Sequence, residues 1–152
     1  MKKLLFILLA ATLAVGFTTL YLSDNELDAD KEAVESLVLN SYVNGAFNKM
    51  DYEAMAAGFH KDFAIFTADG EKLGRYEIAD WVATTKKKRE SPDWKLEDNI
   101  WEHKFPNIDI TGNSAVVKVE LYRNDKHIFT DYLSLLKFES GWKIVGKVYT
   151  RH

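Results

Sequence analysis

Hydrophobic and polar positions follow two different periods along this chain, and the change falls near residue 91. Before this point, apolar side chains recur at steps of three and four residues, which is the spacing of an amphipathic helix. After it, apolar and polar side chains alternate at every second position, which is typical of strands. The pattern therefore predicts helices in the first part of the chain and a sheet in the second.

Three helices are expected before residue 91. The first covers residues 28–48, where one side of the helix is apolar and the other carries acidic and basic residues. A short second helix begins after Asp51, a good N-cap residue, and ends near Gly58. The third covers residues 76–88 and ends in a basic run at 86–89, which is typical of cations that complement a helix C-terminus and face water.

The strand-like segments are separated by turn-forming pairs such as Asp69-Gly70 and Gly112-Asn113. Strands are expected at residues 62–68, 96–110, 115–123, 128–138 and 142–149. The short connections between the last four predict an antiparallel meander. Three helices packed on one face of a curved antiparallel sheet form an α+β fold. The concave space between the layers is where such folds bind small molecules.

The first 22 residues differ from the rest of the chain. Lys2 and Lys3 precede an uncharged apolar run over residues 4–22, the order of features in an export signal. Small residues at Ala14 and Gly16 favour cleavage before Phe17, although the length of the run also fits an uncleaved membrane anchor. We therefore expect residues 1–22 to be a signal peptide or an anchor, and residues 28–150 to be an exported domain, periplasmic or extracellular. Contact with a membrane is expected only through this segment.

Composition narrows the function further. A chain of 152 residues with 47% hydrophobic content has room for one folded domain. The absence of cysteine excludes disulfides, thiolate metal sites and cysteine nucleophiles, and a net charge of -3 gives no footprint for nucleic acid. The spacing of His103, His127 and His152 neither places two imidazoles on one helix face nor brings a third ligand near, so we expect no metal ion. The sequence has no glycine-rich phosphate loop, and we expect no cofactor.

The predicted element order, together with residues 59–62 and the pair Asp51 and Glu53, resembles the NTF2-like (nuclear transport factor 2-like) superfamily. The stretches 109–115, 129–137 and 141–149 resemble its lumazine-binding subgroup, a relative of SnoaL-like and ketosteroid-isomerase-like proteins. The resemblance implies a cone-shaped α+β fold, usually dimeric, with a pocket inside the cone. Members of this superfamily include enzymes, binding proteins and accessory domains, so the fold alone does not determine the function.

Comparison with ketosteroid isomerases shows whether this chain has the catalytic groups of those enzymes. Those enzymes use one carboxylate as a base, and a tyrosine with a protonated carboxyl group as oxyanion donors. The resemblance places the base at Thr67, the carboxyl group at Ser134 and the tyrosine near Tyr42. A threonine cannot remove a proton from carbon at neutral pH, so the comparison argues against this chemistry. His60 with Asp62, or Tyr42, remain the catalytic candidates for an isomerase or hydratase.

By the same overlay, the pocket face is apolar with a few hydroxyl groups. Such a face suits a small, partly aromatic or apolar molecule better than it suits acid-base chemistry. The residues expected to bind it are Tyr42, Phe63, Ile65, Thr67, Trp81, Thr130, Tyr132, Ser134, Leu136 and Val148.

The strand at 128–138 is apolar on both faces. The set opposite the expected pocket contains Phe129, Leu133 and Leu135 around Asp131, and we expect it to face outward. A half-exposed strand normally has one solvated face, so a second copy of the chain is expected to cover this set in a homodimer. The alternative is an interaction module that uses the sheet face and leaves the pocket incidental.

Overall fold

The computed structural model describes residues 26–152, so the predicted export segment and its cleavage site lie outside the described residues. The chain divides into two units, Met1–Glu32 and Ala33–His152. Residues 26–32 of the first unit are helical, and the second unit holds the sheet. Within residues 26–152, no helix is both long enough and apolar enough to cross a membrane.

Three helical elements belong to the second unit. Helical residues 33–37 lead into η1 (Val38–Asn48), which has π-helical hydrogen bonding. The sequence pattern predicted a helix here, as found, but not its π geometry. α2 (Tyr52–Gly58) confirms the predicted cap, because Asp51 Oδ1 accepts a hydrogen bond from the backbone N–H of Ala54 at 3.0 Å. α3 (Ile78–Arg89) begins two residues later than predicted.

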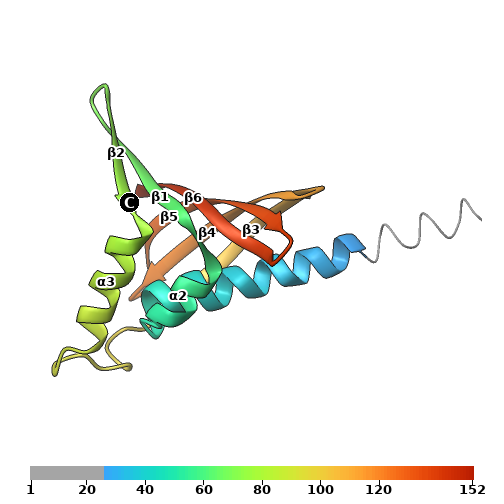
Figure 1. Cartoon of the computed structure of the whole chain (residues 1–152). Helices are drawn as coiled ribbons and strands as arrows, with labels where there is room; N and C mark the ends of the chain where they lie inside the picture. The colour runs from blue at the N-terminus through green and yellow to red at the C-terminus, as the bar shows by residue number, and fades with distance from the viewer. Residues whose placement is uncertain (1–25) are drawn as a thin grey trace, which may run out of the picture. The chain divides into compact units, whose positions relative to one another are not determined.

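The sheet has six strands in the order β2-β1-β6-β5-β4-β3 (Figure 1). β1 runs parallel to β6, and every other neighbouring pair is antiparallel. The α+β class and the meander of the last four strands are confirmed. The strands are β1 (Phe59–Asp69), β2 (Lys72–Glu77), β3 (Glu102–Thr111), β4 (Ser114–Arg123), β5 (Lys126–Phe138) and β6 (Gly141–Arg151).

β2 was not predicted, and its first residues lie directly after the expected turn at Asp69-Gly70. Gly70 has φ +58°, a conformation that glycine adopts without strain, and it lets the chain reverse into an antiparallel hairpin. β2 itself has no buried residue, so it carries no apolar alternation from which a strand could be recognised. Its pairing with β1 comes from the turn rather than from a buried face.

The core lies between the helices and one face of β1, β4, β5 and β6. The inward residues of β5 are Leu133 and Leu135, which are 0% and 1% exposed. This corrects the expected orientation of β5, in which these two residues with Phe129 and Asp131 faced outward. Because both alternate sets of β5 are apolar, the period-two pattern identifies two faces without indicating which one the helices cover.

Candidate functional site

A group of three polar side chains lies in the core. Tyr42 of η1 donates a hydrogen bond to Asp131 Oδ2 at 2.6 Å, and Lys147 Nζ donates to the Tyr42 hydroxyl at 2.7 Å. Lys147 Nζ also forms an ion pair with Asp131 Oδ1 at 2.8 Å. Asp131 pairs with Tyr149 in the β5–β6 ladder, so Lys147 is its diagonal neighbour on the inward face. We call Tyr42, Asp131 and Lys147 the core triad.

Aromatic rings surround the lysine of the core triad. Lys147 Nζ lies 5.0 Å from the centre of the Tyr42 ring, 4.8 Å from that of Tyr149 and 5.5 Å from that of Trp81. Phe47 adds a fourth ring at 5.9 Å. A cation near the faces of aromatic rings is stabilised by their negative faces, and most strongly where water is excluded. The ammonium group is therefore held by one carboxylate and four rings.

Burial also shifts the ionisation of these groups. Removal from water lowers the pKa of Lys147, while the Asp131 carboxylate opposes this shift by favouring the charged amine. Burial raises the pKa of Tyr42 well above its ordinary value, and the negative charge of Asp131 raises it further. Tyr42 therefore stays protonated as a hydrogen-bond donor. The contact of Lys147 with Asp131 Oδ1 is close but poorly directed, so this oxygen receives no hydrogen bond.

The core triad corrects the comparison with isomerases. The carboxyl group beside the helix tyrosine belongs to Asp131, three residues before the predicted Ser134, which is exposed on the other face. At the predicted base position, Thr67 is exposed on β1 and lies beside Gly74 of β2, where the absent side chain leaves room for its hydroxyl. A tyrosine and a carboxyl group are thus adjacent, but both are fully buried.

The second catalytic candidate, His60 with Asp62, lies at the surface of β1. His60 Nδ1 accepts the backbone N–H of Asp62 at 3.2 Å, and the carboxylate is 3.7 Å away and bound to Lys61 instead. The ring of His60 stacks on Phe138, with centroids 5.0 Å apart. His60 therefore neither caps a helix nor has its imidazole oriented by Asp62, and the pair does not form a base with its orienting carboxylate.

The ten residues expected to bind a ligand separate into two groups. Tyr42, Phe63, Ile65 and Trp81 belong to the core, where the ring centres of Tyr42 and Trp81 are 6.1 Å apart. They pack against one another on the inward side. The remaining six do not join this group. Thr67 lies on the same face of β1 as Ile65 but is exposed beyond the core. Tyr132, Ser134, Leu136 and Val148 are exposed on the outer face of the sheet, and Thr130 is buried against two histidines.

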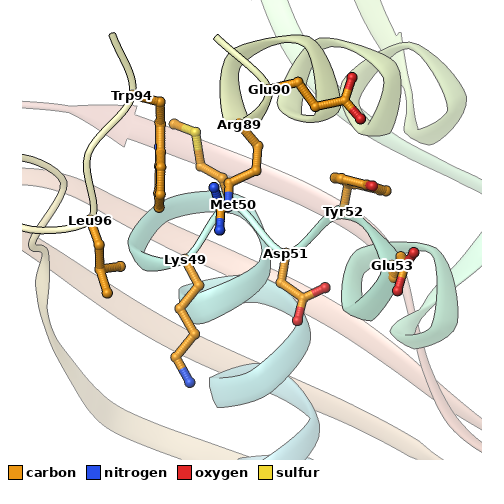
Figure 2. A pocket seen from close by; sticks show the side chains of 9 residues that line it. All are labelled: Lys49, Met50, Asp51, Tyr52, Glu53, Arg89, Glu90, Trp94 and Leu96. Atoms are coloured by element: carbon orange, nitrogen blue, oxygen red, sulfur yellow. The ribbon is translucent and has the colours of Figure 1, made fainter. Parts of the chain in front are cut away.

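A hollow of about 620 Å³ lies instead where η1 ends, α2 begins and α3 ends. Figure 2 shows Trp94 and Leu96 on one side of it, and Tyr52 and Glu53 on the other. We call this space the edge hollow. None of its lining residues was predicted to bind a ligand. They are Lys49, Met50, Asp51, Tyr52, Glu53, Arg89, Glu90, Trp94 and Leu96.

The side chains of the edge hollow are aromatic, apolar and charged. The Arg89 guanidinium lies 3.9 Å from the centre of the Trp94 ring, and the indole Nε1 of Trp94 is buried without a hydrogen-bond partner. Met50 has φ +48°, a left-handed conformation that is strained for a residue with a side chain. Such strain is often found at functional sites. Trp94 lies two residues after Ser91-Pro92, where the helical pattern ends. A tryptophan in a connecting segment is the sequence signal that could have indicated this site.

Among residues 26–152, no group of three or more His, Asp or Glu side chains is arranged to hold a metal ion. The chain has no cysteine. The lining of the edge hollow itself carries aromatic, apolar and hydrogen-bonding side chains.

Comparisons with known proteins identify the family. Residues 29–150 match the sequence model of a family described as "Putative lumazine-binding". An NTF2-like protein of unknown function from Methylobacillus flagellatus KT is 32% identical, with 84% of this chain and 93% of that chain covered and a TM-score of 0.56. No curated protein matches the chain.

Two further solved structures are similar to this one in fold. An NTF2-like protein of unknown function from Shewanella baltica OS155 is 27% identical over 80% of this chain and 92% of that chain, with a TM-score of 0.61. One from Silicibacter pomeroyi DSS-3 is 19% identical over 80% and 94%, also with a TM-score of 0.61, and shows the likeness of fold alone. The chain belongs to the family described as lumazine-binding, within the NTF2-like superfamily.

Proposed function

We propose that this protein binds a small, partly aromatic molecule in the edge hollow. The observation that carries the proposal is the hollow itself, whose volume of about 620 Å³ falls in the range of small-molecule sites, about 300–1,000 Å³. Its lining combines apolar and aromatic surface with a few charged groups, the composition that binds and orients such ligands. The description of the family as lumazine-binding agrees with a ligand of this kind.

The lining favours a planar ligand that carries a hydrogen-bond acceptor. Trp94 offers an aromatic ring already covered on one side by Arg89, and Tyr52 offers a second ring. Trp94 Nε1 is buried and unpaired, so a carbonyl group on the ligand would satisfy it once the indole turns toward the hollow. Lumazine is a planar bicyclic ring with carbonyl groups, and this makes it the first probe to use.

The test is a titration with lumazine followed by calorimetry and by tryptophan emission. We expect saturable binding, and Trp94→Ala should weaken it by about 1–3 kcal/mol, the scale of a lost aromatic contact. Tyr132→Ala is the matched control, because Tyr132 is 44% exposed on the outer face of the sheet and does not line the hollow. Equal affinity for the unchanged protein and Trp94→Ala would place the ligand elsewhere.

A second function, isomerase or hydratase chemistry at Tyr42, is favoured by the core triad. A tyrosine hydroxyl, a carboxylate and an amine of lowered pKa within 2.8 Å of one another could move a proton. Because Tyr42 and Asp131 are 0% exposed, a substrate would have to open the core to reach them. NMR of lumazine incubated with the protein tests this function: conversion that Tyr42→Phe abolishes would support it, and an unchanged ligand would contradict it.

We also propose that the protein is exported. The basic pair Lys2 and Lys3 before an apolar run supports this proposal, with cleavage expected to leave a mature N-terminus between Phe17 and Asp24. N-terminal sequencing of the protein from its own cells is the test. An intact Met1 in the membrane fraction would indicate an anchor, and a soluble cytoplasmic product would contradict export.

A homodimer is proposed through the outer face of β4, β5 and β6. The residues first expected there are inward, but the opposite set is apolar as well: Tyr132 and Val148 are paired neighbours, 44% and 50% exposed. Val116 and Leu136 extend the same surface. Burial of such a surface against a second copy is favourable. Light scattering should give twice the chain mass, and Tyr132→Glu should give a monomer; a monomer without substitution would contradict the dimer.

A further inference from the structure

Thr130 of β5 belongs to the outward-facing set, yet only 9% of it is exposed. Two imidazole rings cover it. His127, near the start of β5, and His152, just after β6, have ring centroids 4.1 Å apart. They are 25 positions apart in sequence and neither lies in a helix, so helical spacing gives no indication of this pair.

An irregularity in the ladder between β4 and β5 brings the rings together. Leu121 pairs with Phe129, whereas Tyr122 pairs with His127, so Ile128 is an extra residue in β5. Simple alternation would put His127 on the side of Phe129, but the bulge turns it to the side of Thr130. The backbone N–H of His152 donates to Ile128 O at 2.9 Å and holds the end of β6 beside the bulge.

Both imidazoles direct the same nitrogen at one point. Nε2 of His127 and Nε2 of His152 lie 3.0 Å and 2.9 Å from Thr130 Oγ1. Nε2 of His127 is also 2.9 Å from the carbonyl oxygen of Phe129, which can only accept, so this nitrogen carries its proton. The Thr130 hydroxyl can then donate to Nε2 of His152. Two imidazole nitrogens close to one oxygen are arranged as two ligands of a metal ion could be.

We propose that His127 and His152 bind a divalent transition-metal ion through their Nε2 atoms, with Cu²⁺ bound most tightly. Imidazole nitrogens suit the late first-row metals, and among these Cu²⁺ binds a given set of ligands most strongly. Thr130 Oγ1 and water complete the coordination. Binding requires His127 to move its proton to Nδ1, because the metal ligand is an unprotonated nitrogen.

Tyr122 and Glu120 of β4 lie next to the histidine pair. Tyr122 stacks on His127, with ring centroids 4.8 Å apart, and its hydroxyl donates to Glu120 Oε2 at 2.8 Å. Glu120 pairs with Thr130 across the ladder, and its carboxylate forms an ion pair with Lys118 at 3.1 Å. The site shares no residue with the edge hollow, so the metal proposal can be tested independently of ligand binding in the hollow.

The test uses the full chain without a polyhistidine tag, titrated with CuCl₂ by calorimetry. We expect one ion per chain at this site, with nitrogen hyperfine splitting in its electron paramagnetic resonance spectrum. His127→Asn and His152→Asn should each lower the affinity by about 100-fold, because the second imidazole binds as an intramolecular ligand. His103→Asn is the matched control, since His103 of β3 contacts Phe105 and lies outside the pair.

A measurement on the unchanged protein guards against variants that fail to fold. In a proton–nitrogen NMR spectrum, substoichiometric Cu²⁺ should broaden the amide signals of residues 122, 127, 130 and 152 first. Broadening centred on another part of the chain would overturn the proposal. So would an affinity that His103→Asn lowers as much as His127→Asn, or one that the double substitution of His127 and His152 leaves unchanged.

Discussion

The core triad and the edge hollow both contain charged groups beside aromatic rings, but their polar groups have different partners. In the core triad, the tyrosine, carboxylate and amine bind one another, and four rings enclose Lys147. In the edge hollow, the charged residues Lys49, Glu53 and Glu90 are exposed to water. The difference indicates that the first group stabilises the fold and the second is available to a ligand.

The largest expected effect is in the core triad. Asp131→Asn removes the negative charge from a buried ion pair and leaves the charge of Lys147 uncompensated. The free energy of unfolding should therefore fall by about 3–5 kcal/mol. Urea denaturation of the variant and the unchanged protein measures the difference. Asp131→Asn together with Lys147→Met, which removes both charges, should recover part of the loss. A cost below about 1 kcal/mol for Asp131→Asn would mean that the pair is not buried as described.

Tyr42→Phe should have the next largest effect. It removes a buried hydrogen bond to a charged group, which costs about 1.5–3 kcal/mol. Because the pKa of Tyr42 is raised in the folded state, its contribution to stability is complete below its ordinary pKa of 10.0 and is lost as the pH rises toward the folded value. Between pH 8 and pH 11, the midpoint temperature of thermal unfolding should therefore fall more steeply in the unchanged protein than in Tyr42→Phe. Parallel curves would contradict the raised pKa.

Asp51 has a structural role although it lines the edge hollow, because its carboxylate caps α2. Asp51→Ala should lower the free energy of unfolding by about 1 kcal/mol through loss of the cap, whereas Asp51→Ser should retain most of it. Chemical denaturation measures both variants. If Asp51→Ser is as unstable as Asp51→Ala, the cap is not the role of this side chain.

The smallest effect is expected for Glu90→Gln. Glu90 lines the hollow and faces Lys86 at 3.9 Å in an exposed pair, and such pairs contribute about 0.5 kcal/mol or less. The free energy of unfolding should be almost unchanged, and added salt should shrink any difference between variant and parent because it screens exposed charges. A loss near that of Asp131→Asn would remove the distinction between the two regions.

Much of the fold follows from the sequence pattern, whereas the orientation of β5 does not. The N-cap at Asp51 and the four-strand meander are local features, set by capping chemistry and by turn residues. The inward face of β5 depends on Asp131, a charge that is tolerated in the core only because Tyr42 and Lys147 reach it from other elements. No local pattern contains that information.

The candidate site was harder still to predict. The edge hollow is formed by the ends of η1 and α3, the start of α2 and the loop that carries Trp94, segments joined only by the tertiary fold. The histidine pair likewise depends on a bulge at Ile128, which a regular alternation of strand residues does not predict. The ten residues expected to bind a ligand lie on the faces of helices and strands, whereas the hollow lies at the ends of helices.

The most direct test of the account compares Trp94→Ala with Tyr42→Phe in one lumazine titration by calorimetry, with the free energy of unfolding measured on the same samples. The account predicts that Trp94→Ala weakens binding by about 1–3 kcal/mol with a smaller change in stability, because its side chain is only half-buried. Tyr42→Phe should lower stability and leave the affinity unchanged. The reverse result, with binding lost in Tyr42→Phe and retained in Trp94→Ala, would contradict it.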